Sequence, residues 1–243
     1  MNALIQPDWP LPQGVAACST TRHGGISLPP YDSLNLGSHV GDVESAVWHN
    51  RELLVAGASL PQMPYWLEQV HGTRVLRLEG QAPTDLRADA VYSNQPGQVC
   101  AVMTADCLPV LFCSRTGKEV AAAHAGWRGL CDGVLESTVA EFAAEPGQIV
   151  AWLGPAIGPQ CFEVGAEVRA AFMAVDAAAD AAFIPHGDKY LADIYLLARQ
   201  RLQAVGITET YGGNRCTVSE ISHFFSYRRE RITGRLASLI WLI

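Results

Sequence analysis

The sequence lacks the features that would direct it to a nucleic acid or a membrane. Only 17% of its 243 residues are charged and its formal net charge is -7. A nucleic-acid partner requires a basic face or stripe, but Glu230 interrupts the densest basic cluster, Arg228, Arg229 and Arg231. No run of about 18 apolar residues occurs, the length that a membrane-spanning helix needs. We therefore expect neither nucleic acid nor membrane as a partner.

Export signals, linkers and phosphate-binding glycine loops are also absent. Asp8, Pro10 and Pro12 interrupt the N-terminus where a signal peptide has an apolar run. No linker-like stretch divides the chain, so we expect a single domain over residues 1–243. Neither GxGxxG nor GxxxxGK[ST] occurs, which excludes nucleotide-phosphate loops of those kinds. We expect a cytoplasmic protein, with a monomer slightly favoured over an oligomer.

The cysteines number seven, an odd count, and no CxxC pair occurs. Without an export signal they are expected to be reduced thiols. Most should pack as small buried hydrophobic residues. Cys107 is the exception, because it lies in a polar segment between two apolar runs.

Apolar periodicity predicts an α/β (α+β) fold. Short runs rich in Val, Leu and Cys predict strands over residues 15–18, 75–78, 99–103, 110–113, 120–123, 149–153 and 239–243. Residues 99–123 are predicted to form a buried hairpin. Helical spacing predicts helices over 130–142, 166–175 and 191–202. Because these elements follow no strict βαβ order, we expect mixed β-sheets flanked by helices.

Three polar segments adjoin the predicted strands, at residues 69–72, 104–109 and 123–129. If strands 110–113 and 120–123 pair across the turn at 114–117, the start of one lies opposite the end of the other. Cys107 and His124 are then neighbours at one end of the sheet. The glycines that follow the histidines, such as Gly72 and Gly126, are not needed by core strands and favour a functional site.

A histidine beside a cysteine at a strand end has three interpretations. The pair can be core packing, or it can be a nucleophilic Cys–His pair. It can also belong to a metal site in which His71 completes a His₂Cys set. Three nitrogen and sulfur ligands suit Zn²⁺, and a fourth position left to water is typical of a catalytic zinc. Spacing alone does not choose between the nucleophile and the metal site.

Long motifs along the whole chain resemble those of the YfiH family, formerly labelled multicopper polyphenol oxidases or laccases. Besides the three polar segments, they cover residues 21–25, 30–37, 39–42, 154–159, 162–165, 193–194, 225–228 and 233–235. The resemblance implies that His71, Cys107 and His124 are the metal ligands and the catalytic centre. It also implies a fold like that of the cytotoxic-necrotising-factor cysteine hydrolases.

The resemblance further implies a zinc-dependent purine nucleoside enzyme. Such an enzyme is a purine nucleoside phosphorylase, a transferase that cleaves adenosine, inosine, guanosine and methylthioadenosine with phosphate. It is also an adenosine deaminase, a hydrolase that replaces the amino group of adenosine with water. Purine nucleosides and phosphate are therefore the expected small-molecule partners.

Two alternative functions remain open. A multicopper laccase needs a trinuclear cluster besides its type 1 site, and the seven histidines, which include no HxH pair, are too few for both. A single His₂Cys site can still take Cu²⁺, so oxidase activity would come from mis-metallated protein. The other alternative is a Cys107-dependent hydrolase that edits peptidoglycan precursors, which rests on fold analogy.

Five residues are expected to bind substrate. Arg128 precedes a predicted helix, whose free N–H groups and positive dipole end bind anions, and its planar fork suits phosphate. Arg22, in a glycine-rich loop, is a second candidate anion ligand. Asn35, Tyr227 and Arg228 lie within the family motifs and complete the set.

Other residues beside the motifs have either a supporting or a structural role. Trp127 either stacks on a purine or packs its helix onto the sheet. The carboxylates either hold a ligand imidazole in the right tautomer, shuttle a proton, or cap a turn. They are Asp42, Asp89, Asp106 and Glu163.

Overall fold

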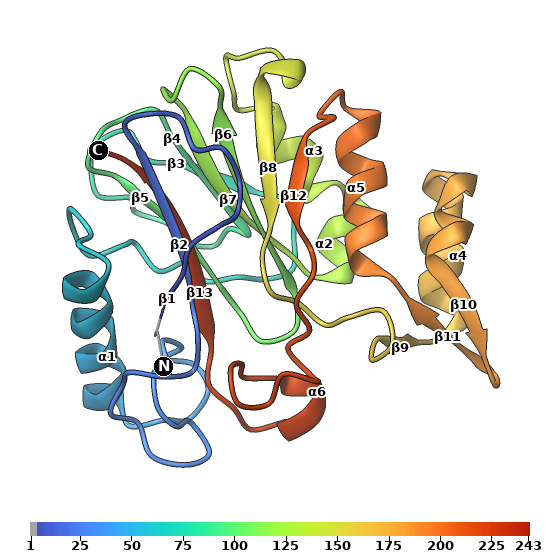
Figure 1. The fold of residues 1–243 in the computed structure, drawn as a ribbon, viewed down its shortest axis with the longest axis horizontal. Coiled ribbons are helices and arrows are strands. Elements are labelled where there is room, and N and C mark those ends of the chain that lie inside the picture. Colours follow the sequence, from blue (N-terminus) through green and yellow to red (C-terminus); the bar gives the residue numbers. More distant parts are fainter. Residues whose placement is uncertain (1–3) are drawn as a thin grey trace.

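Residues 4–243, which the computed structural model describes, form two stacked β-sheets with helices on their outer faces (Figure 1). The larger sheet has the strand order β12 (Thr210–Gly212), β8 (Ile149–Leu153), β6 (Leu108–Ser114), β7 (Val120–Ala125), β4 (Ala90–Ser93) and β3 (Val75–Arg77). The smaller sheet has the order β1 (Leu4–Ile5), β2 (Val15–Thr20), β13 (Leu236–Leu242) and β5 (Val99–Thr104). Parallel and antiparallel pairs both occur in the larger sheet, so the expected mixed sheet flanked by helices is confirmed.

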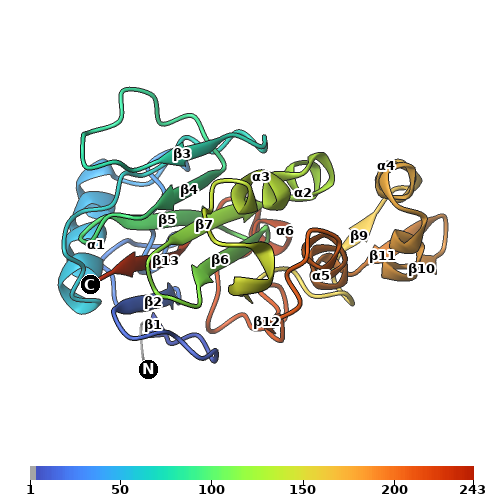
Figure 2. The same ribbon diagram turned by 90° about the horizontal axis from the view of Figure 1, so that it is seen from above.

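Helices cover the outer face of each sheet (Figure 2). Helix α1 (Glu44–Gly57) packs on the four-stranded sheet through Leu54. The six-stranded sheet is covered by α2 (Trp127–Asp132), α3 (Val134–Val139) and α5 (Ile194–Ala204). Beyond α5 lies a third sheet of β10 (Phe183–His186), β11 (Lys189–Ala192) and β9 (Glu163–Val164), with α4 (Ala166–Val175) and a 3₁₀ segment (Ala177–Ala182). Short elements at Pro146–Gln148 and α6 (Tyr227–Glu230) complete the fold.

Strand β7 divides its side chains between two cores. Ala121 and Ala123 pack under the helices, whereas Val120 and Ala122 pack between the two sheets. Because alternate residues of a strand point to opposite faces, His124 shares the face of Ala122. Its imidazole therefore lies at the end of the space between the sheets.

The structure confirms one part of the hairpin predicted over residues 99–123 and contradicts the other. Strands β6 and β7 pair antiparallel, as the sequence predicted, and the register places Pro109 opposite His124. Residues 99–104, however, leave this hairpin and pair as β5 with β13 in the other sheet. Every residue of β5 and β6 is buried, so no polar face in the sequence shows that the two strands belong to different sheets.

The predicted helices need two corrections. The helix over 166–175 is confirmed as α4. The single helix over 130–142 is wrong, because Gly133 adopts φ 102° and separates α2 from α3. The helix predicted from 191 begins at Ile194, where the Asp193 side chain accepts the N–H of Leu196.

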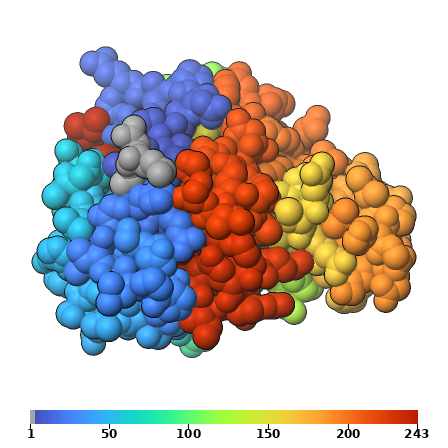
Figure 3. Space-filling model, turned by 60° about the horizontal axis from the view of Figure 1, so that its bottom comes forward, coloured from blue at the N-terminus to red at the C-terminus, as the bar shows by residue number. Residues whose placement is uncertain are grey.

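Segments from the two halves of the chain meet on the face shown in Figure 3, where blue and red regions lie side by side. The N–H of Arg22 donates to the carbonyl of His223, and the N–H of Arg235 donates to the Asn35 side chain. The seven cysteines are all free thiols. Within residues 4–243, no helix combines the length and apolarity needed to cross a bilayer.

Candidate metal centre

Three side chains from separate segments converge at the end of the inter-sheet space. His71 lies in the loop before β3, Cys107 in the turn between β5 and β6, and His124 near the end of β7. Their ligand atoms all lie within 4.8 Å of one another, and Cys107 Sγ is 3.9 Å from His71 Nε2. Within the described residues this is the one group of three or more His, Cys, Asp or Glu with that arrangement. The convergence expected from the sequence is therefore present.

The buried carboxylate of Asp89 holds both histidine segments. Its Oδ1 lies 2.8 Å from His124 Nδ1 and accepts the N–H of His71 at 2.9 Å. Its Oδ2 accepts the N–H groups of Gly72 and Val70. Since a carboxylate only accepts, the contact with His124 places the imidazole proton on Nδ1 and leaves Nε2 to face the other ligands. Of the four candidate carboxylates, Asp89 is the one that orients a ligand.

The backbone around the ligands is constrained. His71 has φ 61° and Asp106, beside Cys107, has φ 93°, the left-handed region that non-glycine residues rarely adopt. The Gln69 amide donates to the carbonyl of Met103 and accepts its N–H, so it holds the His71 loop against β5. Such strain persists where surrounding contacts fix it and is frequent at functional sites.

Asp106 holds the turn that carries Cys107 in place. Its carboxylate accepts the hydroxyls of Thr217 and Ser226 and the backbone N–H of Arg228. These bonds join the Cys107 turn to the start of α6. Asp106 therefore stabilises the turn and is not a ligand of the centre.

Two glycines allow the loops to approach one another. A Cβ on Gly126 would lie 2.6 Å from His71 Cδ2 and 3.3 Å from Cys107 Sγ. A Cβ on Gly129 would lie 2.9 Å from the carbonyl oxygen of Gly72. Contacts under about 3 Å are forbidden to carbon, so only glycine fits at these positions without displacing the ligands.

Neighbouring charges shift the pKa of two ligands. Burial alone raises the pKa of the Cys107 thiol, but the charges and hydrogen bonds of His124 and His71 outweigh it and lower the pKa to about 6. Burial alone lowers the pKa of His124, but Cys107 and Asp89 raise it to about 9. The arrangement thus favours the charged forms of Cys107 and His124, and a metal can bind Nε2 of His124 only where that nitrogen carries no proton.

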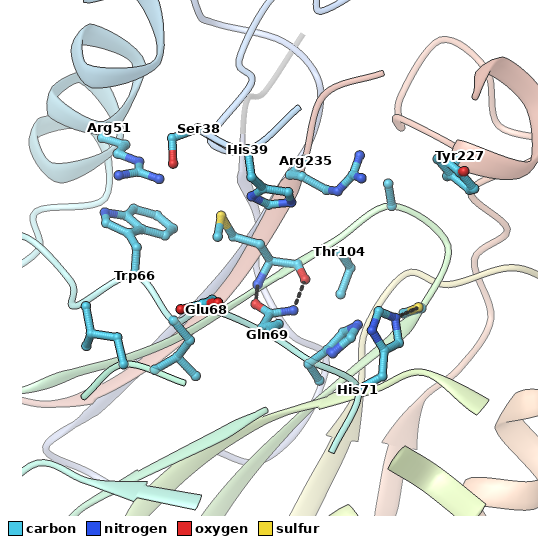
Figure 4. A pocket seen from close by; sticks show the side chains of 16 residues that line it. Ser38, His39, Arg51, Trp66, Glu68, Gln69, His71, Thr104, Tyr227 and Arg235 are labelled. Carbon is cyan, nitrogen blue, oxygen red and sulfur yellow. Dashed lines mark hydrogen bonds between the residues drawn. The ribbon is translucent and has the colours of Figure 1, made fainter. Parts of the chain in front are cut away.

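A cavity of about 820 Å³ opens beside the three side chains (Figure 4). Small-molecule sites commonly have volumes of about 300–1,000 Å³. Besides the three ligands, its polar and aromatic lining consists of Ser38, His39, Arg51, Trp66, Glu68, Gln69, Thr104, Tyr227 and Arg235. The centre therefore faces a space large enough for a nucleoside.

Of the five residues expected to bind substrate, Tyr227 lines this cavity. Arg128 is exposed, stacks on the Trp127 ring at 4.4 Å and is not among the lining residues. Trp127 itself packs against the core under the six-stranded sheet, as its structural interpretation predicted.

The other three lie outside the lining. Arg22 donates to the carbonyl of Asp32 and pairs with two carboxylates. Asn35 is fully buried, and its side chain bonds to backbone groups and to Asp42. Arg228 donates through its guanidinium to the carbonyl of Glu163. All three side chains therefore connect separate segments through hydrogen bonds or ion pairs.

Sequence reasoning missed the residues that form the far wall of the cavity, His39, Arg51 and Arg235. Two of them lie within motifs that had been recognised, at residues 39–42 and 233–235. Arg51 carries a different signal, because it lies four residues after Val47 on the buried face of α1. An arginine at such a position indicates a polar cavity.

The donor set suits zinc. Two imidazole nitrogens and one thiolate are ligands that Zn²⁺ prefers, and three protein ligands leave a position open. The same set can bind one Cu²⁺. A multicopper cluster would need further histidines nearby, and the described residues hold no second group of that kind.

Comparison with known proteins gives matches over the whole chain. A family model described as multi-copper polyphenol oxidoreductase laccase matches residues 16–243. The chain is 69% identical to the purine nucleoside phosphorylase YfiH of Shigella flexneri and 68% identical to that of Escherichia coli, over 100% of each chain. A crystal structure of a Neisseria meningitidis protein matches with a TM-score of 0.93 at 48% identity, covering 99% of both chains.

Proposed function

We propose that this chain is a zinc-dependent purine nucleoside phosphorylase. It belongs to the family described as multi-copper polyphenol oxidoreductase laccase, and relatives similar to this chain are named purine nucleoside phosphorylases. The observation that carries the proposal is the His71–Cys107–His124 set beside a cavity of about 820 Å³. Methylthioadenosine cleavage and adenosine deamination are part of the same proposal. The seven-histidine composition does not support a multicopper oxidase.

In this proposal His71, Cys107 and His124 hold the zinc ion. Bound there, zinc supplies Lewis-acid chemistry that activates water or orients an oxygen of phosphate or substrate. Asp89 keeps Nε2 of His124 free for coordination, and Gln69 keeps the His71 loop against β5. Tyr227 offers an aromatic ring in the lining of the cavity, against which a purine can stack.

Phosphorolysis requires two substrates in one cavity. An oxygen of phosphate forms a bond to C1′ of the ribose while the bond from C1′ to N9 breaks. The electron pair of that bond leaves with the purine, which takes up a proton from solvent or a side chain. Deamination instead adds water to C6 of adenine and releases ammonia. The protein's part in both reactions is to hold the substrates in line and limit their motion.

The proposed function predicts a strict requirement for phosphate. Zinc-loaded protein should convert inosine to hypoxanthine and ribose 1-phosphate only when inorganic phosphate is supplied, because phosphate is the nucleophile. Chromatography of the products with and without phosphate measures this. Adenosine deamination uses water and should proceed in both conditions. Hypoxanthine release at the same rate without phosphate would show hydrolysis and contradict the proposal.

A second candidate function is supported by one arrangement of side chains. Cys107, His124 and Asp89 lie in the order of a nucleophile, a base and an orienting carboxylate. This order suits a cysteine hydrolase, for which peptidoglycan precursors are the expected substrates. The two functions differ in whether the Cys107 sulfur is bound to metal in the active protein.

Alkylation by iodoacetamide separates the two candidates. A zinc-bound thiolate should react slowly and become at least about 10-fold faster after chelation, because only the free thiolate is nucleophilic. Mass spectrometry of the Cys107 peptide measures both rates. Cys161 and Cys216 are also partly exposed and lie outside the centre, so chelation should leave their labelling unchanged. Rapid Cys107 labelling of zinc-loaded protein, with activity lost in step, would favour the hydrolase.

A further inference from the structure

We propose that the far wall of the cavity, formed by Ser38, His39, Arg51 and Arg235, is an anion subsite that takes inorganic phosphate. This inference rests on the proposed phosphorylase function and names the place of its second substrate. In Figure 4 these four residues lie along one side of the cavity, away from His71, and the guanidinium carbon of Arg235 lies 6.0 Å from the centre of the Tyr227 ring. We call the four residues the arginine wall.

Arg51 is a buried cation without an anionic partner. Its side chain comes from α1, the residue is only 9% exposed, and its guanidinium lies 4.5 Å from the Trp66 ring. Both of its hydrogen bonds go to one neutral acceptor, the carbonyl of Leu36. Burial lowers the pKa of Arg51 to about 10, which leaves it charged at neutral pH. A buried charge is costly unless it is paired, so this wall favours a bound anion.

Arg235 shows the same pattern, although it comes from a different segment of the chain. It directly precedes β13, and its Nη1 donates to the carbonyls of Thr233 and Gly234. Among the described residues neither Arg235 nor Arg51 forms an ion pair with a carboxylate. Glu68 also lines the cavity, but it forms an ion pair with neither arginine. The wall therefore holds two guanidinium groups that no carboxylate of the described residues pairs with directly.

His39 lies between the two arginines in Figure 4. Burial, followed by the charges of Arg235 and Arg51, lowers the pKa of His39. At neutral pH its imidazole is therefore neutral and offers one N–H donor. Together with the Ser38 hydroxyl, it adds uncharged donors between two guanidinium groups. This mixture suits a phosphate dianion, whose oxygens accept several bonds at once.

The other candidate arginines are less suited to this role. Arg128 is exposed and stacks on Trp127, and the positive charge of Arg22 is already paired with Asp32 and Glu230. Arg235 shares one cavity with Cys107. Burial lowers the pKa of Arg235, and the negative charge of Cys107 acts in the opposite direction. Phosphate held by Arg235 would thus lie in the same space as a nucleoside beside the metal ligands. The subsite makes Arg235 a substrate-binding residue.

The test compares Arg235→Met, which removes the charge and keeps the stem, with Arg235→Lys, which keeps the charge without the planar fork. Inosine phosphorolysis by Arg235→Met should show a KM for phosphate about 10- to 100-fold higher, the effect of one lost charge-assisted contact. Arg235→Lys should recover part of it. Calorimetric titration with inorganic phosphate should show binding to the wild type and none to Arg235→Met.

Arg169→Met is the matched control, because Arg169 lies over the ring of Tyr190 as Arg235 lies over that of Tyr227, but on the peripheral helix α4. It should leave the KM for phosphate unchanged. Thermal unfolding checks that Arg235→Met is folded, and His39→Gln provides a second variant of the wall if it is not. An unchanged phosphate KM and unchanged binding in a folded wall variant would overturn the subsite.

The outcomes separate this inference from the function on which it rests. Phosphate binding that depends on Arg235, in a protein that does not cleave inosine, would support the subsite and overturn the phosphorylase. Phosphorolysis with an unchanged phosphate KM in Arg235→Met would support the phosphorylase and overturn the subsite. Inosine 5′-monophosphate provides the last comparison. If it binds through Arg235 while inorganic phosphate does not, the wall takes a nucleotide and the inference is overturned.

Discussion

Replacing Cys107 with serine is expected to lower the zinc affinity by at least about 100-fold and to abolish most phosphorolysis, while the protein stays folded. The thiolate is the one anionic ligand of the three, and a serine hydroxyl does not ionise at neutral pH. Loss of an outer partner alone costs about 10- to 100-fold in metal affinity, so loss of a ligand should cost more. The fold should survive, because β6, which follows the turn that holds Cys107, and its partner β7 are buried along their whole length.

Elemental analysis, circular dichroism and the inosine assay on the same samples test this expectation. The wild type should carry about one zinc per chain, since the three ligand atoms are already brought together by the fold. Cys161→Ser is the matched control, because Cys161 is similarly half-buried but lies outside the centre. Full zinc content in Cys107→Ser would remove Cys107 as a ligand. Full zinc content with lost activity would favour the cysteine nucleophile.

The proximity of Cys107 and His124 was predictable because it follows from short-range features, whereas His71 and the assignment of metal ligands came from the resemblance to the family. The turn at 114–117 sets the pairing of β6 with β7, and this pairing brings Cys107 beside His124. A two-strand register depends on few residues and on local turn chemistry. The contribution of Asp89 is non-local, since Asp89 directly precedes β4, which had not been predicted as a strand, and its carboxylate reaches both histidine segments.

The arginine wall was not predictable by the same reasoning. Arg51 comes from α1 and Arg235 from the segment before β13, so the two meet only in the tertiary fold. Helix α1 was itself missed, because its buried face includes the polar residues Asn50 and Arg51 and its apolar periodicity is weak. By contrast, Arg128 seemed suited to phosphate from its place at a helix start. The structure shows its side chain exposed, which sequence position alone does not reveal.

Replacing Asp89 is expected to weaken both the fold and the zinc site. The carboxylate is fully buried and accepts hydrogen bonds from three backbone N–H groups and one imidazole. Burial alone raises the pKa of Asp89, but the bonds from His124 and from the backbone of Gly72 and His71 outweigh it and lower the pKa. Asp89 is therefore ionised at neutral pH. Removing this acceptor leaves several buried donors without partners.

For Asp89→Ala we expect a loss of about 3–5 kcal/mol in the free energy of unfolding, the usual cost of breaking a buried ionic pair. Asp89→Asn should lose less, because one amide oxygen still accepts, but its NH₂ group repels the remaining donors. Urea unfolding of the chelated proteins measures these losses without a contribution from zinc. A loss below about 1 kcal/mol for Asp89→Ala would contradict the central role given to this carboxylate.

The zinc affinity of Asp89→Asn should fall by about 10- to 100-fold beyond any loss of folding, because His124 is no longer held with its proton on Nδ1. Competition with a chelator measures this affinity. Asp42→Asn is the matched control, since Asp42 also accepts bonds from a hydroxyl, an amide and a backbone N–H, but from none of the three ligands. Asp42→Asn should lower stability and leave the zinc affinity unchanged. Equal zinc affinities in the two variants would mean that His124 keeps its tautomer without Asp89, so the fold alone would set the orientation of the ligands.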